Sequence, residues 1–341
     1  MRKFFLGVAL GLAAVSLSAP ALAGRDLDAV RGRGALVCGV AAGGLAGFMV
    51  ADSQGKWKGL DVDVCRAVAA TIFGDSEKVK YVPVSPQQRF TALQSGEVDM
   101  LSNNTTWTLT RDTALGLDFT GVTYYDGQGF MVPKKLGVKS ALELNGATIC
   151  VPSGSTTELN IADYFRANKM TFKPVIIEDV DQIRAAFFNG RCDVYTGDRA
   201  RLFATRSANT ANPDDYVILP EIISKEPLGP VVRHGDNQFG DIVRWAQYAM
   251  IEAEEYGITS KNVDDMLKSD NPVIKRILGV TPGMGKALGV DEKWVYNIVK
   301  QVGNYGECFD RNLGMASPVK MDRGLNKLWT QGGLQYAPPI R

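Results

Sequence analysis

The sequence of 341 residues is poor in histidine and cysteine, with a single histidine, His234, and five cysteines that form no Cys-x-x-Cys pair. This scarcity argues against a zinc site, which needs several such ligands at short spacing. No Ser-His-Asp arrangement, other metal-ligand pattern or glycine-rich phosphate loop is present. General acid catalysis would fall to Asp198 or Glu158, and no matching base is evident. We therefore expect no metal, no cofactor and no enzymatic activity.

An excess of charge of one sign is also missing, as is a second long apolar run. The sequence has 38 Lys and Arg residues against 37 Asp and Glu residues. A near-neutral chain is a poor partner for the nucleic acid backbone, so we expect no nucleic acid binding. Beyond residue 23, no segment approaches the roughly 18 consecutive apolar residues that a membrane-spanning helix needs.

What the sequence does contain begins with a predicted secretory signal peptide at residues 1–23. Two basic residues, Arg2 and Lys3, precede an apolar run over 4–15, and small residues then provide a cleavage site. We expect the mature chain to begin near Gly24. It would have 318 residues and a net charge of −1, because the two basic residues leave with the peptide.

Apolar strands alternate with amphipathic helices along the mature chain. The hydrophobic content of 45% is enough for a large core, and a chain of this length is expected to build more than one lobe. Periodicity and turn residues predict strands at 36–40, 79–84, 98–101, 148–151 and 192–196, and helices at 61–73, 86–96, 159–165, 236–256 and 294–302.

An internal repeat organises these elements. Residues 188–196 repeat 94–102 at an offset of 94, and 145–150 repeat 33–38 at an offset of 112. Strand, helix and strand therefore recur in the same order, which indicates two similar α/β lobes whose parallel strands end in polar loops. A ligand would bind where the loops of the two lobes face each other.

The chain is expected to cross twice between the lobes. Candidate crossings lie at 129–133 and 228–233. Lobe 1 would then comprise 24–130 with 233–341, including a C-terminal extension, and lobe 2 would comprise 131–232.

The cysteines of an exported protein can be oxidised, so one or two disulfides with one thiol left over are expected. Cys150 lies in the first strand of lobe 2, and Cys192 begins the strand that the repeat places beside it. Cys38 in the first strand and Cys65 in the helix packed on it form the other candidate pair. Cys308 would remain a free thiol.

The polar loop after the strand at 98–101 is the first candidate binding segment. Asn104, Thr105 and Thr106 offer hydrogen-bond donors and acceptors, and Arg111 offers a planar fork that matches a carboxylate. The alternative is a solvated loop with a surface arginine. Small residues and Phe48 near the end of the first strand suggest in addition a roomy pocket with an apolar wall.

Two further candidate segments follow strands of lobe 2. Ser155 and Glu158 fit a capping box at a helix start, where free N–H groups can bind an anion, or they form an ordinary cap. Asp198 follows the strand at 192–196, where it could hold an ammonium group, or it could pair with Arg199 or Arg201 on the surface. Together with the carboxylate-binding arginine, Asp198 would complement the zwitterion of an α-amino acid.

These segments together resemble the periplasmic solute-binding proteins of polar amino acid ABC transporters. The resemblance covers about residues 33–256 and is carried by the order of four matching segments, 59–63, 89–112, 153–158 and 190–198. The sequence is similar in particular to the general L-amino-acid-binding (glutamate, glutamine, aspartate and asparagine) branch. Members of that branch also carry Asn-Thr-Thr-Trp-Thr-Leu followed by an arginine, and a longer C-terminal part like 294–341.

The resemblance implies the two-lobed type II periplasmic binding protein fold, an L-amino acid ligand, a permease partner and a periplasmic location. We expect a monomer. In that family, the residues matching Asn104, Thr106 and Arg111 hold the α-carboxylate and amine of the ligand. Those matching Ser155 and Thr156 add hydrogen bonds from the second lobe.

The resemblance also assigns roles to two further charged residues. The family residue matching Asp198 holds the ligand's ammonium group. Arg89 matches an arginine that faces the side-chain carboxylate in acidic-amino-acid binders. Those binders place a serine three residues earlier, where this sequence has Pro86, which argues against strict acidic specificity.

Three functions are compatible with the predicted scaffold. The first is a binding protein that closes on an L-amino acid and delivers it to a permease. The second is a periplasmic dehydratase-type enzyme on the same scaffold, and the third is a ligand-sensing module. The missing catalytic patterns and the signal peptide without an anchoring segment favour the binding protein.

Overall fold

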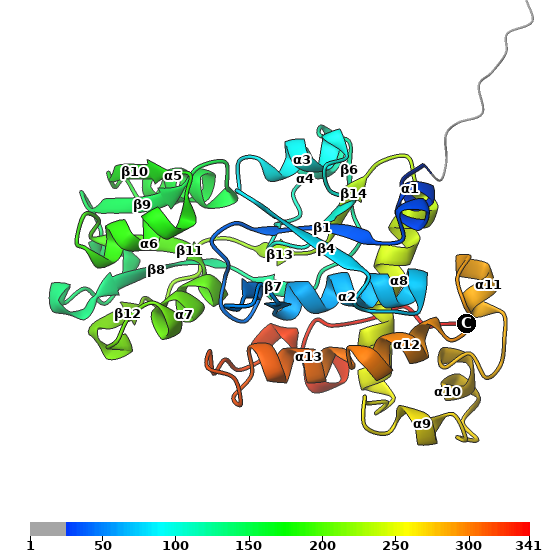
Figure 1. The fold of residues 1–341 in the computed structure, drawn as a ribbon. Coiled ribbons are helices and arrows are strands. Elements are labelled where there is room, and N and C mark those ends of the chain that lie inside the picture. The colour runs from blue at the N-terminus through cyan, green and yellow to red at the C-terminus, as the bar shows by residue number, and fades with distance from the viewer. Residues whose placement is uncertain (1–24) are drawn as a thin grey trace, which may run out of the picture.

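A computed structural model describes residues 25–341, so the predicted signal peptide lies outside the described residues. Two α/β lobes stand side by side, and helices of the C-terminal part pack against one of them (Figure 1). Each lobe is built on a five-stranded mixed sheet. This is the type II periplasmic binding protein fold that the sequence predicts.

The sheet of lobe 1 has the strand order β4-β1-β5-β14-β6. Strands β4 and β5 run parallel to β1, and β14 runs antiparallel to β5 and β6. The strand bounds are β1 Leu36–Ala41, β4 Val79–Val84, β5 Met100–Leu101, β6 Leu117–Phe119 and β14 Val231–Arg233. The helices of this region are α1 Arg25–Arg33, α2 Leu60–Phe73, α3 Arg89–Ser95, α4 Leu109–Thr113 and α8 Asn237–Glu255. A small ribbon pairs β2 Val50–Ala51 with β3 Trp57–Lys58.

The sheet of lobe 2 repeats this arrangement as β10-β9-β11-β8-β12. Its strands are β8 Gln128–Pro133, β9 Thr148–Pro152, β10 Lys173–Ile177, β11 Val194–Asp198 and β12 Tyr216–Ile218. Its helices are α5 Thr156–Ala167, α6 Val180–Phe188 and α7 Arg199–Ala208, with short 3₁₀ turns η1 Lys134–Leu136, η2 Ala141–Glu143 and η3 Pro213–Asp215. In each sheet the first three strands in spatial order are parallel, the fourth is antiparallel to the third, and the fifth is antiparallel to the fourth.

The internal repeat has a structural basis in both lobes. The carboxylate of Asp99 accepts a hydrogen bond from Val37 N at 2.7 Å, and Asp99 N donates to Val37 O at 2.9 Å. Asp193 makes the same two contacts with Thr148, each at 2.8 Å. The repeated aspartate thus ties the strand that follows it to the first strand of each lobe.

The chain crosses between the lobes a few residues earlier than predicted. Residues 129–133 belong to β8 of the second sheet, and 231–233 belong to β14 of the first. The crossings are instead β7 Tyr124–Asp126 and β13 Glu226–Leu228, which pair antiparallel as a two-stranded ribbon between the lobes (Figure 1). The predicted positions differ because β7 and β13 have only three residues each, which is too short for periodicity to separate a crossing from a sheet strand.

Both predicted disulfides are confirmed, and Cys308 is free and buried. The Cα atoms are 6.3 Å apart for Cys38–Cys65 and 5.7 Å apart for Cys150–Cys192. The first bond joins β1 to α2, and the second joins β9 to the segment that leads into β11. The first disulfide therefore fixes α2 against β1, and the second fixes the start of β11 against β9.

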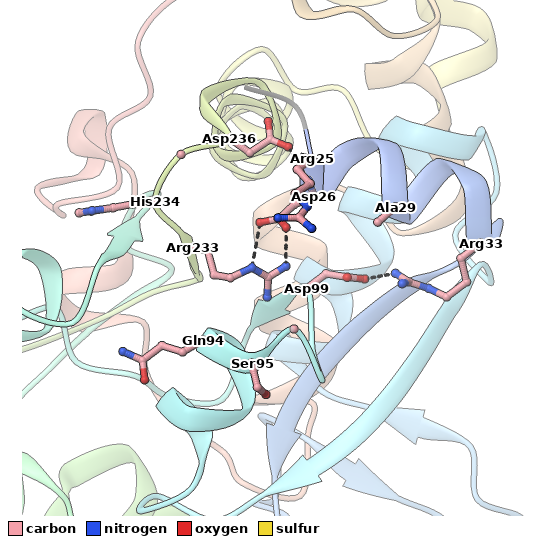
Figure 2. Close-up of a pocket in the computed structure, with 12 residues that line it drawn as sticks. Arg25, Asp26, Ala29, Arg33, Gln94, Ser95, Asp99, Arg233, His234 and Asp236 are labelled. Atoms are coloured by element: carbon pink, nitrogen blue, oxygen red, sulfur yellow. Dashed lines mark hydrogen bonds and ion pairs between the residues drawn. The ribbon is translucent and has the colours of Figure 1, made fainter. Parts of the chain in front are cut away.

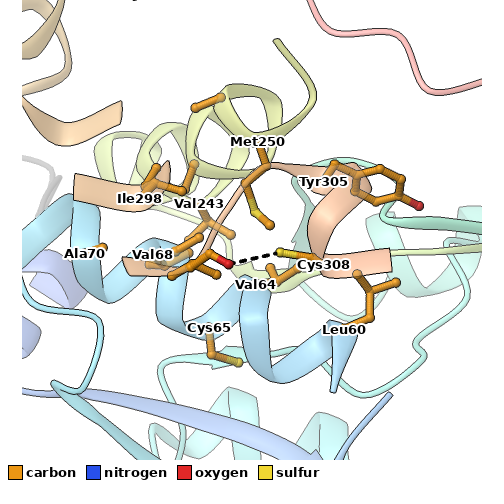
Figure 3. Close-up of a cluster of buried hydrophobic side chains, with 14 of the residues drawn as sticks. Leu60, Val64, Cys65, Val68, Ala70, Val243, Met250, Ile298, Tyr305 and Cys308 are labelled. Atoms are coloured by element: carbon orange, nitrogen blue, oxygen red, sulfur yellow. Dashed lines mark hydrogen bonds between the residues drawn. The ribbon is translucent and has the colours of Figure 1, made fainter. Parts of the chain in front are cut away.

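The main core lies where α2, α8 and the C-terminal helices meet (Figure 3). Helix α2 is buried on nearly every face, because the sheet covers one side and α8 and α12 cover the other. The C-terminal helices are α9 Val263–Met266, α10 Pro272–Ile277, α11 Met284–Leu288, α12 Trp294–Gln301 and α13 Tyr305–Asn312, followed by η4 Gly324–Asn326 and η5 Trp329–Gln331. No helix among residues 25–341 is long and apolar enough to span a membrane.

The C-terminal extension also binds the first crossing strand. The side chain of Asn326 accepts from Tyr125 N at 2.7 Å and donates to Tyr125 O at 3.1 Å. The hydroxyl of Tyr305 and the amide of Gln335 both donate to Thr123 O, at 2.8 and 3.2 Å. The extension therefore pairs with the backbone of β7 and the residue before it, although 201 residues separate Asn326 from Tyr125.

Candidate functional site

A small cavity of about 30 Å³ lies between the lobes, near the C-terminal ends of β5 and β11. Its lining residues are Pro86, Arg89, Asn104, Thr106, Pro152, Ser155, Thr156, Thr157, Asp198 and Arg201. Six of the seven predicted site residues are among them, and Arg111 is not. The structure thus brings side chains from both repeats to one place, as the parallel arrangement of the strands requires.

The side chain of Asp61 supports the loop that carries Asn104 through hydrogen bonds. One oxygen of this buried carboxylate accepts from Ser102 Oγ, and the other accepts from Asn104 N, both at 3.1 Å. Burial raises the pKa of Asp61 to about 7. Asn104 has a φ of 53°, a left-handed conformation that asparagine tolerates better than most residues. Its Oδ1 is buried and has no hydrogen-bond partner within residues 25–341, so it is available to a ligand.

The sequence signal for this support is Gly59, which directly precedes α2. Gly59 has a φ of 135°, and a Cβ there would lie 2.1 Å from Phe48 O. Only glycine fits this approach, and the turn brings Asp61 into the first turn of α2 under the loop. The Gly-Leu-Asp segment carried the family resemblance, but its supporting role was not predicted.

Arg89 and Arg111 both stack on Phe90. The two guanidinium carbons lie 4.9 and 5.0 Å from the centre of the ring. Within residues 25–341 no carboxylate lies within ion-pair distance of either arginine, and Arg89 Nε has no hydrogen-bond partner. Burial lowers the pKa of both guanidinium groups, and for Arg89 the neighbouring charge of Arg111 lowers it further.

Arg111 lies beside the cavity rather than in its lining. It is the third residue of α4, whose N-cap Thr108 accepts a hydrogen bond from Arg111 N at 3.3 Å. Its Nη1 donates to Thr106 O at 2.9 Å, which leaves the rest of the guanidinium free for another acceptor. Arg201, which the sequence analysis considered only as a surface partner of Asp198, lines the cavity instead.

The predicted capping box at the start of α5 is wrong. Ser155 is the N-cap residue, but its hydroxyl donates to Pro152 O at 2.7 Å instead of capping the helix. Glu158 accepts from Gly154 N at 3.3 Å. The first N–H groups of α5 therefore have no side-chain cap, which suits an acceptor that enters the cavity.

Asp198 ends β11 and is buried in the cavity lining. No ion pair joins it to Arg199 or Arg201 within the described part of the chain, so the surface salt bridge considered from sequence is not formed. Burial raises the pKa of Asp198 to about 6, although nearby Arg201 opposes the shift. The crossing strand supports this region, since Asp126 accepts from Ala200 N at 3.0 Å at the start of α7.

Glu226 of the crossing strand β13 contacts two lining residues of the cavity, and sequence reasoning missed it. It is buried, and its carboxylate accepts hydrogen bonds from Thr106 of lobe 1 and from Thr156 of lobe 2, the second at 3.0 Å. No local pattern marks this residue, because its partners are 120 and 70 residues away in the chain.

The rims of the two lobes touch each other across the cleft. Arg184 of α6 donates to Gly43 O at 2.7 Å and to Gly44 O at 3.2 Å. Close to this contact, Ser85 Oγ donates to Glu178 at 2.8 Å. Polar contacts thus join the two lobes across the cleft.

The predicted apolar wall at Phe48 is wrong. Phe48 is fully buried and packs edge-on against Tyr124 at 5.2 Å, so it belongs to the core and not to the cavity lining. The cavity lining is mostly polar, with Pro86 and Pro152 as its apolar members.

A larger hollow of about 540 Å³ lies elsewhere on lobe 1, around His234 and α1 (Figure 2). Its charged side chains are mostly paired: Arg33 with Asp99, and Arg233 with Asp26 at 2.8 Å. We do not assign a ligand to it, since the interlobe cavity alone collects the predicted site residues. No cluster of three or more potential metal ligands occurs within residues 25–341.

Comparison with known proteins bears on this arrangement. The family description "Bacterial extracellular solute-binding proteins, family 3" matches residues 36–262. The chain belongs to this family. It is therefore a solute-binding protein and not an enzyme, which sets aside the dehydratase alternative. The C-terminal extension lies beyond the matched region.

Full-length relatives share this extension. The chain is 56% identical to the general L-amino acid-binding periplasmic protein AapJ of Rhizobium johnstonii, with 100% of both chains covered. It is 55% identical to the glutamate/glutamine/aspartate/asparagine-binding protein BztA of Rhodobacter capsulatus, again with 100% of both covered. Like its relatives, this solute-binding protein is periplasmic.

A solved structure is also similar throughout. A periplasmic binding protein of an ABC transporter from Brucella ovis, with glutathione bound, is 57% identical and superimposes with a TM-score of 0.90. The match covers 92% of this chain and 99% of that chain.

Proposed function

We propose that this solute-binding protein captures L-amino acids in the interlobe cavity and delivers them to the permease of an ABC transporter. The single observation that carries the proposal is that a buried acid, Asp198, lines a cavity beside the guanidinium groups of Arg89 and Arg111, and neither guanidinium forms an ion pair within residues 25–341. An α-amino acid presents the complementary ammonium and carboxylate groups.

The proposed roles follow from the geometry and the family resemblance. Asn104, Thr106 and Arg111 hold the α-carboxylate and amine from lobe 1. Ser155 and Thr156 add contacts from lobe 2, where the uncapped start of α5 is favourable for a carboxylate.

Asp198 holds the ammonium group, and Arg89 faces the distal end of the ligand side chain. Because hydroxyl and amide groups line much of the cavity, charged and neutral polar side chains are both accommodated. We therefore propose a broad range that includes glutamate, glutamine, aspartate and asparagine. The names of the two full-length relatives support this range.

A thermal-shift screen against the twenty amino acids tests the proposal, because a ligand that binds only the folded state raises the melting temperature. Asp198→Asn should abolish the shifts, since it removes the charge that pairs with the ammonium group. Asp163→Asn is a matched control, because this carboxylate lies on the exposed face of α5 with a side chain 76% exposed. The proposal fails if no amino acid shifts the wild-type protein.

Glutathione is a second candidate ligand, since the similar Brucella ovis protein has glutathione bound. Its γ-glutamyl end carries a free α-amino and α-carboxylate group, so the same Asp198 and arginine contacts would apply. Adding reduced glutathione and γ-glutamylcysteine to the screen separates this candidate. A shift with these compounds and none with free amino acids would favour it.

We further propose that the protein acts as a monomer, since one chain supplies both sides of the cavity. The lobes are proposed to meet at the ribbon of β7 and β13. Small-angle scattering tests closure, because a ligand that bridges the lobes should reduce the radius of gyration.

A further inference from the structure

Glu226 lies behind the cavity lining, between the two lobes. Its side chain is 1% exposed. Oxygen Oε2 accepts from the hydroxyls of Thr106 and Thr156. Oxygen Oε1 accepts from Asn160 Nδ2 and from Ser224 Oγ, both at 2.7 Å. The carboxylate is thus fully hydrogen bonded and acts on the cavity only through the two threonines.

These contacts decide the direction of two hydroxyl protons. A threonine hydroxyl has one proton and two lone pairs. Because both protons are donated to Glu226, Thr106 and Thr156 can offer only lone pairs in every other direction. Their oxygens lie 3.4 Å apart, and both residues line the cavity. The cavity therefore receives two hydrogen-bond acceptors here and no hydroxyl donor.

The backbone keeps Thr106 and Glu226 together. Thr106 forms an isolated antiparallel bridge with Leu228, and Trp107 N donates to Pro227 O at 2.8 Å. The backbone at residues 106 and 107 thus pairs with β13 like a short additional strand. Thr156 comes from α5 in lobe 2, so one oxygen of Glu226 collects a hydroxyl from each lobe.

We propose that Glu226 is a positioning residue that aims the lone pairs of Thr106 and Thr156 into the cavity, and so selects ligands that carry an ammonium group. This inference rests on the proposed amino acid-binding function. A hydroxyl that only accepts suits an N–H donor and repels a carboxylate oxygen. Asp198 in the same cavity reinforces the preference with its charge.

The test compares ligands with and without the α-ammonium group. L-Glutamate is paired with glutarate, and L-alanine with propionate, in calorimetric titrations of the wild type and of Glu226→Met and Glu226→Gln. Met leaves both threonine protons free to turn into the cavity. The affinity ratio of each amino acid to its partner should then fall about tenfold or more, the worth of one charge-assisted hydrogen bond.

Glu226→Gln keeps the size of the side chain and serves if the Met variant does not fold, and its ratio should fall as well. Ser224→Ala is the matched control. It removes one donor to the far oxygen and leaves the threonine contacts in place, so its ratio should equal that of the wild type.

The outcomes separate the two proposals. If both members of each pair lose affinity equally in the Gln and Met variants, Glu226 has only a structural role and the inference is overturned. An unchanged ratio in both variants overturns it as well. Absence of amino acid binding by the wild type overturns the proposed function itself, before any variant is measured.

Discussion

Replacement of Arg89 by methionine should stabilise the ligand-free protein while it weakens binding of acidic amino acids. Arg89 is 6% exposed, its Nε has no partner, and no carboxylate within residues 25–341 forms an ion pair with it. Burial lowers its pKa well below the ordinary value, which means that the folded protein disfavours the charged form. At neutral pH the guanidinium is still charged, so its burial opposes folding.

The magnitude follows from known costs of buried charges. Exchange of buried ionic groups for apolar residues of similar volume is neutral or stabilises by about 1 to 4 kcal/mol. Methionine has a similar length and no charge, so the melting temperature should rise by a few degrees. Loss of a buried partner for a ligand carboxylate costs about 2 to 5 kcal/mol of binding free energy. The affinity for glutamate and aspartate should therefore fall by roughly 30-fold or more. The affinity for glutamine and alanine should fall by no more than about tenfold, which corresponds to the loss of a neutral hydrogen bond.

Differential scanning calorimetry and calorimetric titration measure the two effects on the same samples. Arg89→Lys keeps the charge and loses the planar fork, so it should not raise the melting temperature. Arg166→Met on the exposed face of α5, where the side chain is 80% exposed, should change neither quantity. Equal losses for all four ligands with an unchanged melting temperature would refute the reasoning, because Arg89 would then neither read side-chain charge nor oppose folding.

Three further predictions concern other parts of the site and fold. Arg111→Ala should weaken the binding of every amino acid by at least roughly 30-fold, and Arg111→Lys should restore the affinity only in part. Undiminished binding of glutamate, glutamine or alanine in calorimetric titration would remove Arg111 from the site. Burial raises the pKa of Asp198 from 3.8 to about 6, so amino acid affinity should fall as the pH drops below about 6. Because the folded pKa is the higher one, protonation of Asp198 favours the folded state, and its contribution to stability should rise as the pH falls from 7 towards 4. Asp198→Asn should abolish this pH dependence in chemical denaturation, and its persistence would contradict the assignment. Replacement of Cys150 and Cys192 by alanine opens a loop with a sequence separation of 42 and should lower the free energy of unfolding by about 4 kcal/mol in chemical denaturation, whereas an unchanged value would mean that the bond is not formed in solution.

Much of the fold could be predicted from the sequence, because the internal repeat indicates two lobes with the same order of strands and helices. Strand β4 was predicted with its observed bounds, and α2 to within one residue, since each has a clear period and ends at a turn signal such as Gly74, which has a φ of 69°. Both disulfide pairs followed from neighbouring strands and a helix packed on a strand. Polar residues at the ends of parallel strands must meet at one edge, which is why six of the seven candidate residues line one cavity.

The tertiary structure decided what depends on contacts between distant segments. Glu226 is 120 residues from Thr106, and no local pattern links an acidic residue in a short strand to a threonine in another lobe. The hydroxyl of Ser155 fits a capping box by spacing, but it donates to the nearby carbonyl of Pro152, and its oxygen accepts no hydrogen bond from the backbone of α5. The hydrogen bond between Asn326 and Tyr125 of β7 joins residues that are 201 positions apart in the sequence. Periodicity and spacing report on neighbours along the chain, whereas the partners of a buried polar group are chosen by what folding brings within about 3 Å of it.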